Sequence, residues 1–240
     1  MHALGGILFL AVALVSFAAE KDRSPNVHLP FNGKNLTGWK FKGAAEKSRW
    51  VVGKATVSAQ TPGKFDVAVA TNAVTDPAKQ QLVNGDLHSV NIYTEEKYGD
   101  CRIELEFMIP KGSNSGVYVM GEYEIQIADS FGKDQIGAGD LGGLYGAAAP
   151  KTNASKAPGE WQSFVIDFQA PKFQGEKKIS NAKFLKIMLN GQVIHENVEM
   201  TDVTRSGVTG KESATGPLMF QGNHGEVAFR NIKITMTSSQ

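Results

Sequence analysis

The residues whose types and spacing could do chemistry are concentrated in one segment, "NSGVYVMGEYEIQIADSFG", residues 114–132. Polar and apolar side chains alternate through its middle, so a strand here would bury its apolar residues on one face. The opposite face would carry Glu122, Glu124 and Gln126. A long loop, residues 131–159, follows, and loops of that length in compact domains are usually functional or disordered. The pattern predicts that this polar face lines a cleft.

Three side chains are candidates for proton transfer: Glu124, Asp129 and His224. Glu124 could act as a base, or it could be an exposed strand carboxylate. His224 lies in the glycine-flanked turn "QGNHGEV", where an imidazole can act as acid, base or metal ligand, or simply bond to backbone. Asp129 precedes Ser130 and could equally be a turn or cap residue. Glu124 and His224 could also hold a divalent cation, although no diagnostic metal spacing is present.

Six further residues are candidates for binding a ligand. The amides among them can hydrogen-bond sugar hydroxyls but cannot transfer protons at neutral pH. The aromatic residues offer an apolar face with a polar tip, which suits a sugar ring, although a tryptophan that opens a strand is often a core residue. The six are Asn114, Gln126, Gln221, Tyr118, Tyr145 and Trp161.

Short strands must position these side chains. The segment 101–109 alternates Ile103, Leu105 and Phe107 with charged residues, which predicts a strand with one core face and one ordinary solvent face that carries Glu104. Asn190-Gly191 between alternating segments predicts a type I′ hairpin. A helical period is found, beyond the N-terminus, only at residues 76–82. Evenly spaced strands of this kind predict an all-β fold in which two antiparallel sheets pack face to face.

Composition excludes several classes of partner. The chain has 240 residues, 25 Lys and Arg against 24 Asp and Glu, and a net charge of +1. Without a basic cluster, neither nucleic acid nor an anionic membrane is expected to bind. Cys101 is the only cysteine, so no intrachain disulfide can form. No dinucleotide fingerprint is present either. A neutral ligand fits this composition best.

The N-terminus predicts export. An apolar run over residues 4–17 precedes small residues at Ser16 and Ala18, the pattern that signal peptidase accepts. We therefore predict a signal peptide over residues 1–18, followed by a single domain over residues 24–240. The run is shorter than the roughly 20 residues of a membrane-spanning helix, and no cysteine follows it, so no membrane anchor is expected.

Five motifs in order carry a family resemblance. They are "FNGKNLTGW", "YGDCRIELEFMIPKGSNSGVYVMGEYEIQIADS", "GGLYGAAAPKTNASKAPGEWQSF", "LNGQVIHEN" and "GPLMFQGNHGEVAFRNIKI". Over residues 29–235 the chain resembles the 3-keto-disaccharide hydrolase family, also described as 3-keto-glucoside 1,2-lyase and 3-keto-2-hydroxy-glucal hydratase domains. The resemblance implies a concanavalin A-like jelly-roll sandwich, exported to the periplasm or the medium by bacteria that degrade glycosides.

The resemblance also implies the chemistry. A ketone at carbon 3 of a glucoside acidifies the hydrogen on carbon 2, so a base can start β-elimination of the group on carbon 1. Hydration of the resulting 3-keto-2-hydroxy-glucal completes a net hydrolysis to 3-keto-glucose. No nicotinamide or flavin is required, because a separate glycoside 3-oxidoreductase makes the ketone. Two alternatives stay open: an ordinary glycoside hydrolase with paired carboxylates, and a non-catalytic carbohydrate-binding module.

Overall fold

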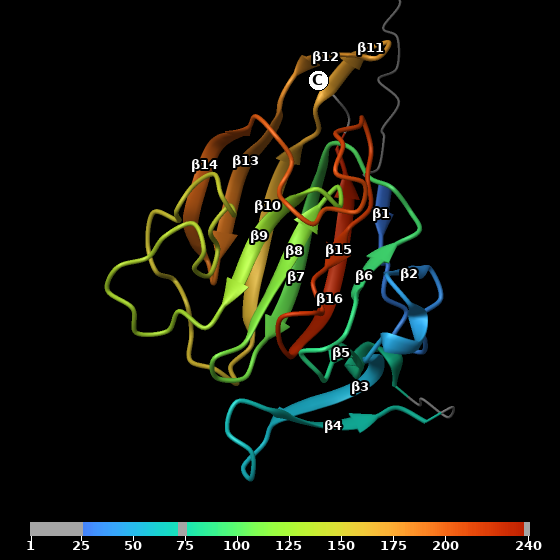
Figure 1. Cartoon of the computed structure of the whole chain (residues 1–240), viewed down its shortest axis with the longest axis vertical. Coiled ribbons are helices and arrows are strands. Elements are labelled where there is room, and N and C mark those ends of the chain that lie inside the picture. The colour runs from blue at the N-terminus through green and yellow to red at the C-terminus, as the bar shows by residue number, and fades with distance from the viewer. Residues whose placement is uncertain (1–25, 72–75, 238–240) are drawn as a thin grey trace, which may run out of the picture.

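Strands make up most of the regular structure in the computed structural model, which describes residues 26–71 and 76–237 (Figure 1). The predicted signal peptide, residues 1–18, lies outside the described residues. Helical structure in the described ranges is limited to two short 3₁₀ turns, η1 (Ala45–Lys47) and η2 (Pro77–Lys79). None of the helices described there has the length and apolar character needed to cross a membrane.

The larger sheet has nine strands. Their order is β14-β13-β10-β7-β16-β5-β3-β4, and β1 pairs with β16. All the pairings are antiparallel. The bounds are β1 Asn26–His28, β3 Trp50–Val57, β4 Phe65–Val69, β5 Gln81–Asn84, β7 Cys101–Met108, β10 Gln162–Gln169, β13 Ala182–Leu189, β14 Gln192–Met200 and β16 Val227–Met236.

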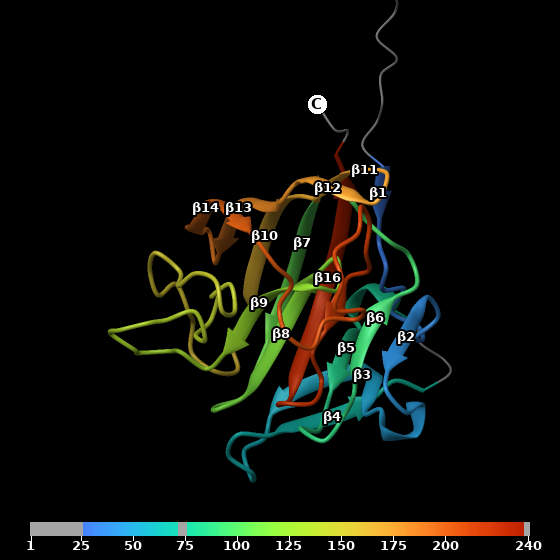
Figure 2. The same cartoon turned by 45° about the horizontal axis from the view of Figure 1, so that its top comes forward.

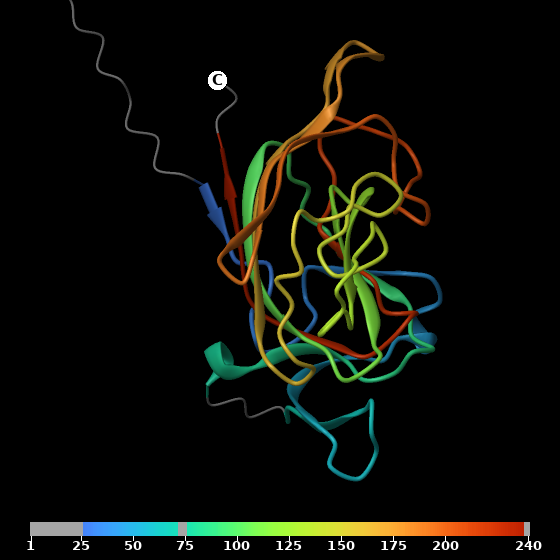
Figure 3. The same cartoon turned by 90° about the vertical axis from the view of Figure 1, so that its left-hand side faces the viewer.

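The smaller sheet has five strands in the order β2-β6-β15-β8-β9, also antiparallel. Their bounds are β2 Trp39–Lys42, β6 Asn91–Thr94, β8 Asn114–Val119, β9 Tyr123–Ala128 and β15 Met219–Phe220. A separate two-stranded ribbon joins β11 (Lys172–Gln174) to β12 (Lys177–Ser180). In Figures 1 and 2, β8 and β9 lie in front of β7 and β10, and Figure 3 shows the two layers from the side. This confirms the predicted all-β sandwich of two antiparallel sheets.

The core lies between the two sheets. Ile103, Leu105 and Phe107 of β7 are buried on its inner face, while Glu104 alternates onto the outer face, as the sequence predicts. Phe220 of β15 stacks on Phe229 of β16 across the two layers, with ring centroids 3.9 Å apart. Burying side chains of this kind contributes about 1.5–3 kcal/mol each relative to exposure, so this inter-sheet layer holds the smaller sheet in place.

Two local predictions have opposite outcomes. Asn190 and Gly191 have φ values of 51° and 82° in the turn between β13 and β14, which confirms the predicted hairpin. The helical pattern over residues 76–82 was wrong beyond one turn, because η2 ends at Lys79 and β5 begins at Gln81. Pairing of β5 with both β3 and β16 in the buried interior of the larger sheet overrides that local period.

Candidate active site

The outer face of β9 is not an ordinary solvent face. Glu122, Glu124 and Gln126 point away from the core, as predicted, yet each is no more than 4% exposed. Residues 142–145 of the long loop pair with the free edge of β9, and residues 204–210 of a second loop bond to the Glu124 N–H and to the Glu122 carboxylate. Polar side chains that would otherwise be hydrated are therefore enclosed.

A cavity of about 210 Å³ opens on this face. Seven of the nine predicted site residues line it, together with two that sequence reasoning missed, Arg205 and Ser206. The seven predicted residues are Asn114, Tyr118, Glu124, Gln126, Tyr145, Gln221 and His224. We call this cavity the Glu124 chamber.

Glu124 is positioned by its neighbours on β8. It pairs in register with Tyr118, and its carboxyl group extends over Gly116, where a Cβ would lie 2.3 Å from Glu124 Oε1. The backbone N–H of Glu124 donates to Thr204 Oγ1 at 3.0 Å, which ties the second loop to the strand. Only a glycine at position 116 leaves room for the carboxyl group in this place.

Tyr145 is positioned by an extra line of backbone pairing. The long loop runs beside the free edge of β9, where Gln126 N–H donates to Gly143 O at 2.8 Å and Gly142 N–H donates to Gln126 O at 2.8 Å. Tyr145 N–H then donates to Glu124 O at 3.1 Å. Pairing with the edge of the sheet therefore fixes residues 142–145 of the loop, which include Tyr145.

His224 is carried by a turn that packs closely against β8. A Cβ at Gly225 would lie 2.3 Å from Ser113 Oγ, so this position needs glycine. Asn84 Nδ2 donates to Gly222 O and Gly225 O, both at 2.8 Å, and fixes both ends of the turn. His224 Nδ1 lies 2.7 Å from Asn223 Oδ1, so Nδ1 carries the hydrogen and Nε2 stays available for a ligand.

Burial changes the acidity of Glu124. It raises the pKa of this carboxyl group from 4.5 to about 7, and a hydrogen bond with the Tyr118 hydroxyl partly opposes the rise. The same burial, together with the neighbouring Glu124 charge, raises the pKa of Tyr118. The Tyr118 hydroxyl also donates to Arg205 O at 3.2 Å. Because a hydroxyl has one proton, it can serve only one of these acceptors at a time.

Two amide oxygens in the chamber have no hydrogen-bond partner among the described residues: Gln126 Oε1 and Gln221 Oε1. Their nitrogens are engaged, since Gln221 Nε2 donates to Glu124 Oε1 at 3.4 Å and Gln126 Nε2 donates to Gly139 O at 3.3 Å. A buried acceptor without a partner costs about 1–3 kcal/mol, which hydroxyl groups of a ligand could recover. The chamber is therefore suited to a polyhydroxylated ligand.

The donor set also suits a hard cation in chemical type. Glu124 offers carboxylate oxygens, the two unpartnered amides offer carbonyl oxygens, and His224 offers a ring nitrogen. Within residues 26–71 and 76–237, no group of three or more His, Cys, Asp or Glu side chains could hold a metal ion. A cation in the chamber would thus depend on amide oxygens in addition to Glu124 and His224.

Two predicted site residues lie elsewhere. Asp129 Oδ2 accepts a hydrogen bond from Gly112 N–H at 2.8 Å, so this side chain closes the turn before β8 instead of lining the chamber. Trp161 precedes β10 of the larger sheet, and the Arg230 guanidinium lies 3.9 Å from its ring centroid. The structure therefore does not bring these two side chains to the chamber: Asp129 bonds within a turn, and Trp161 packs on the other sheet.

Glu122 has a structural task. Its carboxylate accepts hydrogen bonds from Thr209 N–H at 2.7 Å, Thr209 Oγ1 at 2.8 Å and Gly210 N–H at 3.0 Å. These bonds anchor the second loop and leave Glu124 as the one carboxylate among the described residues that line the chamber.

Arg205 and Ser206 belong to that anchored loop and gave no periodic signal in the sequence. Ser206 has a φ of 65°, and its carbonyl accepts a hydrogen bond from Lys42 Nζ at 2.6 Å. Burial lowers the pKa of Lys42, and the Glu122 charge partly opposes this. A non-glycine residue at positive φ, held by specific bonds, is typical of functional loops.

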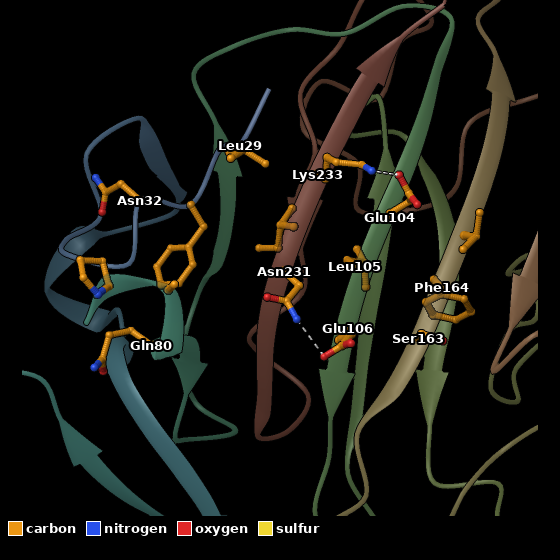
Figure 4. Close-up of a pocket in the computed structure, with 15 residues that line it drawn as sticks. Leu29, Asn32, Gln80, Glu104, Leu105, Glu106, Ser163, Phe164, Asn231 and Lys233 are labelled. Carbon is orange, nitrogen blue, oxygen red and sulfur yellow. Dashed lines mark hydrogen bonds and ion pairs between the residues drawn. The ribbon is translucent and has the colours of Figure 1, made fainter. Parts of the chain in front are cut away.

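Another cavity lies on the outer face of the other sheet. Its volume is about 740 Å³, and it includes Glu104 and Glu106 (Figure 4). Lys233 Nζ lies 2.5 Å from the carboxylate of Glu104, and Arg230 Nε lies 2.5 Å from that of Glu106. Both carboxylates are thus half-exposed and paired, so this cavity lacks a group comparable to Glu124.

Comparison with known proteins agrees with this architecture. A family profile described as a 3-keto-alpha-glucoside-1,2-lyase-like domain matches residues 28–235. Among solved structures, a candidate glycosyl hydrolase from Parabacteroides distasonis is similar, with TM-score 0.66, 23% identity, and coverage of 88% of this chain and 84% of that one. A second from the same organism gives TM-score 0.59 and 21% identity, covering 88% and 94%. At these identities the structures share the fold. No curated protein matches the chain.

Proposed function

Because the chain belongs to the family of 3-keto-alpha-glucoside-1,2-lyase-like domains, we propose that it cleaves 3-keto-glycosides by β-elimination, hydration of the resulting glucal, or both. In the elimination, the C2–H proton passes to a base, the C1–O bond breaks, and a C1–C2 double bond forms. The leaving oxygen takes up a proton. Addition of water across that double bond then gives 3-keto-glucose, so the two steps together amount to hydrolysis.

Glu124 is the proposed base. A carboxyl group with a pKa of about 7 is substantially ionised at neutral pH, and it is a stronger base than an ordinary glutamate. Its burial in a chamber lined by amides and hydroxyls keeps bulk water from competing for the proton. The raised pKa of Glu124 is the single observation that supports this proposal most strongly.

The other chamber residues fit the remaining tasks. The Tyr118 hydroxyl and the amide N–H groups of the two glutamines are donors that could stabilise the enolate oxygen at carbon 3. The imidazolium form of His224, which carries a proton on Nε2 as well as on Nδ1, is the proposed acid that protonates the leaving oxygen. Asn114 and Tyr145 would then contact sugar hydroxyls and the ring face.

The isolation of Glu124 favours this chemistry over ordinary glycoside hydrolysis. A glycosidase of the usual kind needs two carboxyl groups about 5–9.5 Å apart. The neighbouring strand carboxylate, Glu122, is taken up by Thr209 and Gly210, and it does not line the chamber. A binding module would have no need of a buried carboxyl group with a raised pKa, because that group costs stability when ionised.

The cellular setting is part of the same proposal. The substrate is a small neutral carbohydrate, a separate glycoside 3-oxidoreductase supplies its ketone, and a signal peptide over residues 1–18 exports the chain to the periplasm or the medium of a bacterium. A mature N-terminus at Ala19 in the exported fraction would support this, whereas one at Met1 would contradict it.

Product analysis by NMR tests the activity. The purified mature chain is incubated with a 3-keto-glucoside and with its unoxidised parent, with and without a chelator. We expect turnover of the 3-keto-glucoside alone, and loss of turnover with chelator would assign a cation to the chamber. Turnover restricted to the unoxidised parent would contradict the proposed function.

A further inference from the structure

A second cavity adjoins the Glu124 chamber. It has a volume of about 700 Å³ and is lined by residues 145–147 and 199–205. Tyr145 and Arg205 line both cavities, so the two cavities adjoin at these residues. We call the larger cavity the 199–205 groove.

The chamber alone is small for the whole of a disaccharide. Pockets for drug-sized ligands occupy about 300–1,000 Å³, whereas the chamber has about 210 Å³. A ring whose carbon 2 lies beside Glu124 therefore has to extend its carbon 1 substituent out of the chamber. The 199–205 groove shares Tyr145 and Arg205 with the chamber, and its volume of about 700 Å³ is enough to receive that substituent.

Arg205 lies where the two cavities adjoin, and its guanidinium is available to a ligand. Its side chain is exposed and has no hydrogen bond or ion pair with the described residues. Its backbone is held firmly, since Arg205 O accepts from the Tyr118 hydroxyl and the next carbonyl accepts from Lys42 Nζ. Thr204 N–H also donates to Glu122 O at 2.8 Å. A fixed backbone that presents a free guanidinium is suited to ligand binding.

We propose that the 199–205 groove is the leaving-group subsite and that Arg205 donates a hydrogen bond to the oxygen that departs from carbon 1. This inference rests on the proposed function for the identity of the reaction. When the C1–O bond breaks, its electron pair moves to the leaving oxygen. The guanidinium stabilises that charge without giving up a proton, because an arginine side chain stays protonated in proteins, and the proposed acid His224 supplies the proton.

The lining of the groove indicates the chemical class of the leaving group. Thr201 and Thr204 offer hydroxyls, and Glu199 and Asp202 offer carboxylates that accept hydrogen bonds. Tyr145 is the one aromatic side chain among the described residues of the lining, so a flat aromatic group has little to stack on. The two carboxylates would also repel an acidic sugar. The groove therefore suits a neutral, polyhydroxylated leaving group, such as a second sugar.

Leaving groups of different acidity test the role of Arg205. We would measure kcat/KM for Arg205→Met and Arg205→Lys on a 3-keto-disaccharide and on a nitrophenyl 3-keto-glucoside. Arg205→Met should lose about 10- to 100-fold on the disaccharide, the range for a lost hydrogen bond to a charged group, and only a few fold on the nitrophenyl substrate. Arg205→Lys should recover part of the loss. Equal losses on both substrates, or none on either, would overturn the role.

Lys211→Met is the matched control. Lys211 is an exposed cation in the same loop, and it lines neither the chamber nor the groove. This variant should keep kcat/KM for both substrates within about twofold, as expected for a surface change away from special features. A loss equal to that of Arg205→Met would show that loop charge in general is responsible, which contradicts the specific contact.

A binding experiment tests the role of the groove independently of the reaction. In a Glu124→Gln background, where the proposed base is absent, calorimetry would compare maltose with methyl α-glucoside. A second-sugar subsite predicts about tenfold tighter binding of maltose, and Arg205→Met should remove that preference. Equal affinity for the two sugars would overturn the subsite. If the wild type turns over neither 3-keto substrate, the proposed function fails while this comparison still decides the groove.

Discussion

The carboxyl group of Glu124 lies directly over Gly116, so that a Cβ on Gly116 would be 2.3 Å from Glu124 Oε1. Two strands are involved, because Gly116 belongs to β8 and Glu124 to β9. Because Gly116 on β8 has no side chain, it leaves the space that the Glu124 carboxyl group of β9 occupies.

Gly116→Ala should displace the Glu124 carboxyl group from the chamber. Because the new methyl group and Oε1 cannot both keep their places, we expect kcat/KM on a 3-keto-glucoside to fall at least tenfold, in line with the cost of misplacing a catalytic group by about 1 Å. Gly137→Ala is the control, since the nearest atom to a Cβ there, Asp140 Oδ2, lies 4.0 Å away. Steady-state kinetics and circular dichroism on both variants check this. Full activity in Gly116→Ala would contradict the role given to Glu124.

The pH dependence of kcat/KM should report the raised pKa of Glu124. As a base, Glu124 works only when ionised, so the acid limb of the kcat/KM profile should rise with pH through about 7. An acid limb near 4.5 would mean that a carboxyl group of ordinary acidity is the base. The profile is measured on a 3-keto-glucoside between pH 4 and 9, with substrate stability checked at each pH.

Glu124→Gln should stabilise the fold at alkaline pH. Between pH 4.5 and about 7 the folded wild type keeps a proton that the unfolded chain releases, so its free energy of unfolding falls as pH rises. Glutamine does not titrate. The variant should match the wild type near pH 4.5 and exceed it by up to about 3 kcal/mol at pH 8. Urea unfolding at the two pH values measures this difference, and a constant difference would show that burial does not perturb Glu124.

The sequence predicted the layers and the strand faces because both depend on local alternation. Period 2 in residues 101–109 and 122–127 is a property of neighbouring residues, and so is the positive φ that Asn190 and Gly191 tolerate. The family resemblance, which rests on the order of five motifs along the chain, supported the same fold prediction. The helical pattern over residues 76–82 failed beyond Lys79 for the opposite reason, since burial between β3 and β16 depends on residues far away in the sequence.

The chamber was predictable only in part. Glu124, Gln126 and His224 stand out by residue type within strand and turn patterns, and the structure brings them to one cavity. The burial of Glu124 depends on loops that fold back over β9, which alternation cannot reveal. Arg205 lies in such a loop and is presented by bonds to Glu122, Tyr118 and Lys42. In the sequence, the one signal was an arginine directly before Ser206-Gly207, and that signal is weak on its own.

Replacing Glu124 and His224 should distinguish a catalytic chamber from a binding surface. Glu124→Gln and His224→Ala should each lower turnover of a 3-keto-glucoside about 100-fold or more, the usual range for loss of a general acid or base. Both side chains line the same cavity, so the double variant should lose less turnover than the product of the two single losses. A binding module would show no turnover to lose.

Glu104→Gln is the internal control for these variants. Glu104 also alternates with apolar residues on a strand, but it lies on the outer face of the larger sheet, where Lys233 Nζ is 2.5 Å from its carboxylate (Figure 4). Its side chain is 32% exposed, so loss of this ion pair should cost about 0–1 kcal/mol of stability and leave turnover unchanged. Should Glu104→Gln lower turnover as much as Glu124→Gln while staying folded, the active site would lie on the opposite sheet, in the cavity beside Glu104.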